Sequence, residues 1–214
     1  FQLYQNLHFK FQTKIKTKII NAKRQSKKIC PIFAQELESF MNERRKKIQE
    51  LRGKLTNKDT KVVLHGLEQM KEDGEAELIP DLIQVLDSNK STEVHNKALE
   101  ILNTLKYQAA TTTVLKTLKH INNEEVVNEV LASCWKSGLD YSNHFDTLID
   151  VFIDEDFVNA LEAFTIIENS TQNISNESLD NAIIKIKGSL DRINEEKKPL
   201  MLELTHLLES RKTE

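Results

Sequence analysis

The chain has 214 residues, which is enough for one domain or for one domain with an extension. It contains only 5 Gly and 3 Pro, and the abundance of Leu, Glu, Lys and Ile favours a largely helical protein. No apolar run approaches the roughly 18 to 20 residues that cross a bilayer, and two cysteines are too few for a disulfide framework. We therefore expect no membrane segment and a cytoplasmic location.

Residues 1–40 differ in charge from the rest of the chain. They carry eight basic and two acidic residues, a net charge of +6, whereas residues 41–214 carry 22 basic and 31 acidic residues, a net charge of −9. Three interpretations compete: an organellar targeting segment, a basic arm for an anionic surface or nucleic acid, or sequence upstream of a protein that begins at Met41. We favour the last, and expect 1–40 to be a poorly ordered or partly helical basic leader outside a folded domain at 41–214.

From Met41 onward, apolar periodicity and polar breakers predict five helix pairs. The first helices of the pairs are expected at about 42–55, 76–87, 109–121, 142–153 and 177–190. The second helices are expected at about 60–72, 92–106, 124–137, 155–168 and 196–210. The corresponding repeats span about 42–73, 76–106, 109–138, 142–168 and 177–210.

An apolar pattern returns every 32 residues in the second helices, at offsets that place four side chains on one helix face. Its members are Val62, Gly66, Leu67 and Met70, then Val94, Ala98, Leu99 and Leu102, then Val126, Val130, Leu131 and Cys134. In the fourth pair the pattern drifts, with Ala160, Leu161 and Phe164 following at an interval of 30. The first helices repeat a second pattern: Leu82, Ile83 and Leu86, then Val114, Leu115 and Leu118, then Leu148, Ile149 and Phe152, then Ala182, Ile183 and Ile186.

Two apolar helices per period predict an all-α fold, a right-handed α-solenoid of about five antiparallel helix pairs. The segment from Val94 to Leu102 resembles the second helix of short HEAT repeats of the phycobilisome-lyase type, Val-Arg-x-x-Ala-x-x-Ala-Leu. The resemblance covers about 42–168 well and 177–210 weakly. The chain departs from the family at the Arg position, which holds Val63, His95 and Val127 and so lacks the Arg of the inter-repeat Arg–Asp bonds.

No spacing typical of catalysis occurs. The six His never form HxxxH or HExxH, and GxxxxGK[ST], GxGxxG and GxSxG are missing. We therefore expect no catalytic residue, no metal site and no cofactor, and predict a monomeric, non-enzymatic scaffold that binds a protein or peptide. The alternatives are a HEAT-like lyase or chaperone-type enzyme and nucleic-acid binding through the basic leader. The net charge of −9 opposes nucleic-acid binding by the body.

The resemblance implies that the second helices line the concave face of the stack. Outward positions on them predict a binding strip, which includes Glu68, Asn96, Glu100, Asn128 and Glu129 and continues to Asn159 and Glu162. Trp135, the only tryptophan, stands where other repeats have Lys71 and Asn103, and Tyr107 and Tyr141 lie at helix ends near it. Trp135 and Tyr107 are thus predicted partner-binding residues. The alternative is that Trp135 folds onto Leu139 or Tyr107 as part of the core.

Overall fold

The computed structural model describes residues 31–73, 75–88, 91–170 and 174–212. The chain divides into two compact units, residues 1–47 and 48–214. All regular elements of the described residues are helical. The prediction of an all-α protein is therefore confirmed for this part of the chain.

Ten α-helices lie in the described residues, in the order of the chain. They are α2 (Pro31–Leu55), α3 (Thr60–Asp73), α4 (Ile79–Ser88), α5 (Thr92–Asn103), α6 (Ala110–Leu118), α7 (Glu124–Lys136), α8 (Phe145–Asp154), α9 (Phe157–Ser170), α10 (Asn176–Ser189) and α11 (Lys198–Arg211). Short 3-10 turns stand at Ala76–Leu78, Ser142–His144 and Leu190–Arg192. Each predicted helix is present within a few residues of its expected bounds, except at the start of the first.

Helix α2 begins at Pro31, earlier than the start expected near residue 42, and runs through Met41 without a break. The segment from Ala34 to Arg45 is rich in Glu, Gln, Arg, Met and Leu, which are strong helix formers, and it contains neither Gly nor Pro. The predicted helix start near residue 42 was therefore wrong. The leader prediction for residues 1–30 lies outside the described residues.

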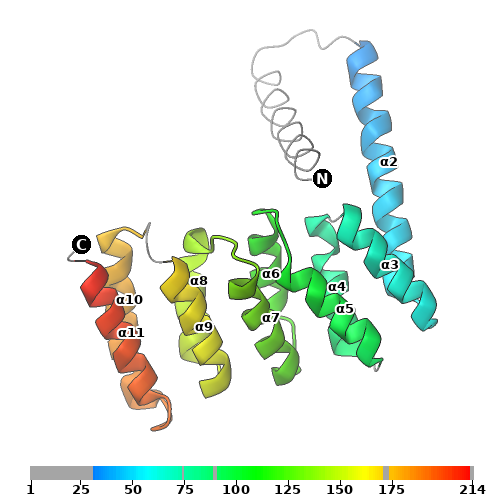
Figure 1. Ribbon diagram of the computed structural model, residues 1–214. Helices are drawn as coiled ribbons and strands as arrows, with labels where there is room; N and C mark the ends of the chain where they lie inside the picture. Colours follow the sequence, from blue (N-terminus) through cyan, green and yellow to red (C-terminus); the bar gives the residue numbers. More distant parts are fainter. Residues whose placement is uncertain (1–30, 74, 89–90, 171–173, 213–214) are drawn as a thin grey trace. The chain divides into compact units, whose positions relative to one another are not determined.

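Within residues 48–214 the helices contact one another in two sequential series (Figure 1). The second helices α3, α5, α7, α9 and α11 each contact the next in the series. Among the first helices, α4 contacts α6 and α8 contacts α10. The two helices within each of four pairs are also in contact: α4 with α5, α6 with α7, α8 with α9, and α10 with α11. Each of these first helices therefore packs against the second helix that follows it in the chain.

The apolar patterns mark the core. All twelve residues of the first-helix pattern are buried, and ten of the twelve residues of the 32-residue pattern are buried, Val62 and Leu99 being half-buried. One slot of the second-helix pattern always holds a small or β-branched side chain: Gly66, Ala98 and Val130. A Cβ built on Gly66 would lie 2.8 Å from Lys54 Cβ, so a side chain there would collide with the C-terminal turns of α2.

The predicted register of α9 was wrong. Leu161, expected in the core, is 45% exposed, whereas Asn159, expected on the outward strip, is only 1% exposed. The buried residues Asn159, Ala163 and Ile167 follow Val126, Val130 and Cys134 at an interval of 33, not 30. The error arose because Asn159 is a polar residue in a slot that holds Val in three earlier repeats, so the apolar pattern alone favoured the wrong alignment.

Local side-chain chemistry sets several helix ends. Asn123 Oδ1 accepts from the Glu125 backbone N–H at 3.1 Å at the start of α7, and Ser175 Oγ accepts from the Ser178 N–H at 3.2 Å at the start of α10. Gly138, which follows α7, has φ of 67°, a left-handed conformation that favours glycine. These residues set both ends of the second helix α7 and the start of the first helix α10.

Candidate functional site

Three side-chain hydrogen bonds join consecutive second helices. Lys71 of α3 donates to Glu100 of α5. His95 Nε2 of α5 lies 2.8 Å from Glu129 Oε1 of α7. The indole Nε1 of Trp135 in α7 donates to Glu162 Oε2 of α9 at 2.6 Å. We call these three bonds the cross-helix ladder; in each of them a Glu of the later helix faces a nitrogen of the earlier one.

Three of the predicted binding residues, Glu100, Glu129 and Trp135, also have a structural role as members of the cross-helix ladder. Glu100 also lies 3.4 Å from Lys97 Nζ, and hydrogen bonds to Lys71 and Lys97 hold the pKa of the Glu100 carboxyl below its ordinary value. His95 stands at the position where the resemblance expects Arg, and its bond to Glu129 links two successive repeats there. The structure thus contains inter-repeat polar bonds, although the residues differ from an Arg–Asp pair.

Trp135 is 37% exposed and therefore belongs partly to the surface. Its indole N–H bonds across to α9, and the Lys136 ammonium lies 5.4 Å from the centroid of its ring. The hydrogen bond to Glu162 and the contact with the Lys136 ammonium thus hold the indole ring where α7 meets α9. An aromatic side chain fixed in this way loses little conformational entropy when a partner covers it.

The two tyrosines near Trp135 in the sequence are not equally accessible. Tyr141 is 1% exposed, so it belongs to the core. Tyr107 is half-buried, and its hydroxyl has no hydrogen-bond partner among the described residues. Burial raises the pKa of both phenols, and it raises the pKa of the neighbouring Cys134 thiol to about 12. Cys134 is thus a protonated, buried thiol at neutral pH.

The remaining predicted strip residues lie at different depths. Glu68 and Asn96 are exposed, and Asn128 and Glu129 are half-buried. Two of their atoms, Asn128 Nδ2 and Glu129 Oε2, are buried with no hydrogen-bond partner among the described residues. The structure therefore brings Glu100, Glu129 and Trp135 into one ladder, whereas Asn159 is removed from the strip.

Asn159 is a buried polar residue with a local explanation. Its backbone N–H donates to Asp156 Oδ1 at 2.8 Å, and its Nδ2 lies 3.5 Å from Glu155 Oε2. These contacts tie the first turn of α9 to the acidic residues before it. Glu155 and Asp156 thus lie just before α9, where negative charge favours the start of a helix.

A surface hollow of about 440 Å³ opens where the N-terminal ends of α8 and α10 meet. Ser142, Asp146, Ile174 and Ser175 are among its lining residues, with His144. His144 Nε2 lies 3.2 Å from Thr111 Oγ1 and 3.1 Å from Thr112 Oγ1, and burial and the nearby Lys116 lower the pKa of its imidazole. The Nε2 atom of His144 thus contacts two hydroxyl groups of α6.

No cluster of His, Cys, Asp or Glu suited to a metal ion is found in the part of the chain that the structure describes. Likewise, none of the helices built from these residues is both long and apolar enough to cross a membrane.

Two apolar residues of α9, Val158 and Leu161, are 57% and 45% exposed, which the apolar patterns of the sequence did not predict. A charge signal accompanies them: residues 137–184 contain ten Asp or Glu and no Lys or Arg. That block could have been found in the sequence, because it is a long interruption in an otherwise mixed charge pattern. This acidic block includes both α8 and α9.

No protein-family model matches this chain, and no curated protein was found to match it.

Proposed function

We propose that the protein is a non-enzymatic binding scaffold, a right-handed HEAT-like α-solenoid that holds a protein or peptide partner along its second helices. The observation that supports this most directly is the cross-helix ladder with Trp135 left partly exposed at its last step. A polar ladder keeps consecutive helices in register, and the exposed ring offers a fixed apolar anchor. The binding strip of this proposal comprises Glu68, Asn96, Glu100, Asn128, Glu129, Trp135 and Tyr107.

The solenoid part of the proposal rests on nearest-neighbour packing. One helix pair cannot bury both of its apolar stripes by itself, so each pair must stack on the next. The sequential contacts among α3, α5, α7, α9 and α11 are those that such stacking requires. The absence of a side chain at Gly66 allows the close approach of α3 to the end of α2.

A protein or peptide fits this surface better than a nucleic acid. Residues 41–214 have a net charge of −9, which repels a phosphate backbone. Mixed polar side chains around one aromatic anchor are typical of a protein-binding surface. We further propose that the protein acts as a monomer in the cytoplasm.

The test is affinity capture from a cell extract with the immobilised full chain. We expect Trp135→Ala and Glu100→Lys to lose partners that the unaltered chain captures. The matched controls are Ile184→Ala and Glu177→Lys, which change an exposed apolar and an exposed acidic residue on the first helix α10. Circular dichroism melts establish that each variant is folded. If Trp135→Ala and Glu100→Lys retain every partner, the proposed strip is wrong.

A further inference from the structure

A patch of exposed apolar side chains lies on α9 and beside it. Six large apolar side chains are exposed in the described residues, and three of them, Trp135, Val158 and Leu161, belong to α7 and α9. Val158 and Leu161 are three residues apart on one helix and so share its outward face. The 2.6 Å bond from Trp135 to Glu162 brings the indole to the same part of α9. We call Trp135, Val158, Leu161 and Glu162 the α9 surface.

The α9 surface stands in the most acidic part of the chain. The block 137–184 has ten acidic residues and no Lys or Arg, so every ammonium group that reaches it comes from outside. Lys185 pairs with Asp150 of α8, and Lys212 pairs with Asp180 of α10. Lys197 Nζ donates to the backbone carbonyls of Ile153 and Glu155 at 2.9 and 2.5 Å, at the end of α8. These cations neutralise α8 and α10 and do not bond to the α9 surface.

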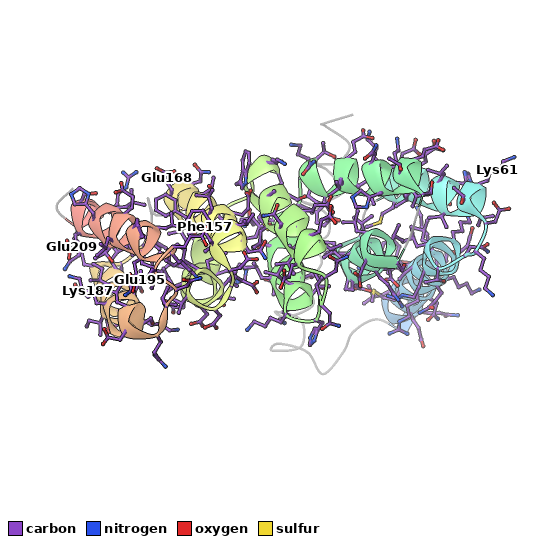
Figure 2. The ribbon with its side chains drawn as sticks, turned by 90° about the horizontal axis from the view of Figure 1, so that it is seen from below. Lys61, Phe157, Glu168, Lys187, Glu195 and Glu209 are labelled. Atoms are coloured by element: carbon purple, nitrogen blue, oxygen red, sulfur yellow. The ribbon has the colours of Figure 1, made fainter. Side chains whose placement is uncertain are left out.

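The charge of Glu162 differs from that of the other ladder carboxylates. Glu100 accepts from two ammonium groups, those of Lys71 and Lys97, which compensate its negative charge. Glu162 accepts from the indole of Trp135, which is neutral, so the bond fixes the carboxylate without compensating it. Glu168, labelled in Figure 2, is a further acidic residue of α9. The Lys136 ammonium lies 5.4 Å from the centroid of the Trp135 ring and is engaged with that ring.

From these contacts we infer that the α9 surface is a docking site for a basic amphipathic helix, one that presents Leu or Ile on one face and Lys or Arg beside it. The inference rests on the proposed function and names the chemistry of the partner. The apolar face of such a helix would cover Val158, Leu161 and the Trp135 ring, which removes apolar area from water. Its flanking cations would meet the carboxylate of Glu162, which favours the correct orientation and speeds association.

The opposite charge on a partner is disfavoured by the same surface. An acidic helix would place carboxylates next to Glu162 in a region without Lys or Arg between positions 137 and 184. Like charges brought together at an interface oppose binding. Charge, and not the apolar contact alone, therefore decides which amphipathic helix binds.

The test uses the full chain and a synthetic peptide of Leu and Lys that presents Leu on one helical face. Trp135 is the only tryptophan, so its fluorescence reports directly on the α9 surface. We expect the Leu/Lys peptide to shift the Trp135 emission to the blue, and its affinity to fall as salt rises from about 50 to about 500 mM. A peptide with each Lys changed to Glu is the matched control, and it should not bind.

Variants then locate the contact. Leu161→Asp and Glu162→Lys should weaken binding by about tenfold or more. Ile184→Asp and Glu177→Lys make the same chemical changes on α10 and should leave the affinity unchanged. Fluorescence anisotropy of a labelled peptide serves as a second readout, because Glu162→Lys also alters the Trp135 environment. Leu161 is 45% exposed, so its replacement leaves the core intact.

Several outcomes would overturn the inference. Equal binding of the Leu/Lys and Leu/Glu peptides would show that charge has no role, and wild-type affinity in Leu161→Asp would remove the α9 surface. A dimer in sedimentation that Leu161→Asp abolishes would make a second copy of the chain the occupant instead. If the captured partners depend on Trp135 and Glu100 but Leu161→Asp does not change peptide binding, only this inference fails. If Leu161→Asp weakens peptide binding but the captured partners do not depend on Trp135 or Glu100, the binding strip is wrong and the α9 surface stands.

Discussion

The hydrogen bond between Trp135 and Glu162 should stabilise the fold as well as position the ring. We would remove its donor with Trp135→Phe, which keeps an aromatic ring, and its acceptor with Glu162→Ala. A double-mutant cycle on the free energy of unfolding isolates the interaction, because the separate costs of each replacement cancel. The two residues lie on different helices of the second series, so their coupling measures the contact of α7 with α9.

The expected coupling follows from the geometry. A hydrogen bond to a charged group contributes about 1.5–3 kcal/mol when it is well buried. Trp135 is 37% exposed and Glu162 is half-buried, so water competes for both partners and the contribution is smaller. We therefore expect a coupling of about 1 kcal/mol. For a chain of this length, that corresponds to about 2–4 °C in the melting temperature.

Urea unfolding followed by far-UV circular dichroism provides the measurement, since Trp135→Phe removes the only tryptophan. The same cycle with Glu177→Ala in place of Glu162→Ala is the control and should show no coupling. Replacement of Glu162 by Gln keeps an acceptor without charge, and should lose only part of the interaction. A coupling in the Trp135–Glu162 cycle no larger than in the control cycle would refute the argument that the bond joins α7 to α9.

Three further predictions test other parts of the structure. Gly188→Ala should stabilise the protein by about 0.5–1 kcal/mol, because Gly188 is helical and nothing lies within 4 Å of a Cβ there. Gly66→Ala should instead destabilise it, because the new Cβ would lie 2.8 Å from Lys54 Cβ of α2. Equal effects of the two replacements in urea unfolding would contradict the packing of Gly66 against Lys54. The His144 pKa is lowered below its ordinary value of 6.5, so its contribution to stability is complete above about pH 6.5 and is lost as the pH falls towards the folded-state value. The stability difference between the unaltered chain and His144→Gln should therefore depend on pH between 7 and about 5, and a constant difference would exclude the effect. In a Cys30→Ser variant, Cys134 should react with a thiol reagent at pH 8 only after urea unfolds the chain, because burial raises its pKa to about 12; rapid reaction of the folded protein would disprove its burial.

The helices were predictable because their signal is periodic. The first-helix pattern from Leu82 to Ile186 consists of apolar residues that the structure buries in every case. Spacing alone identifies such a face, since residues three and four apart lie together on a helix. In α9 the polar residue Asn159 interrupts the apolar pattern, and the predicted register of that helix was therefore wrong. The predicted start of α2 was too late, because the prediction followed the position of Met41 and not the helix propensity of the residues before it.

The cross-helix ladder could not be predicted in the same way. Its three bonds span sequence separations of 29, 34 and 27 residues, so no fixed slot of the repeat supplies donor and acceptor. Long side chains reach different positions on the next helix, and the choice depends on the turns between helices as well as on the repeat. Trp135 was identified as unusual from its slot, but its bond to Glu162 required the relative placement of α7 and α9.

The cross-helix ladder also explains how similar hydrogen bonds produce a surface that changes from one second helix to the next. Its nitrogens are an ammonium in Lys71, an imidazole in His95 and an indole in Trp135. All three can hold a glutamate of the next helix, but an indole cannot carry the compensating charge of an ammonium. The hydrogen bond from Trp135 to Glu162 therefore joins α7 to α9 without compensating the negative charge of Glu162. Because that step also carries the exposed ring of Trp135, the negative charge and the apolar contact area needed to select a basic amphipathic partner occur together at α9.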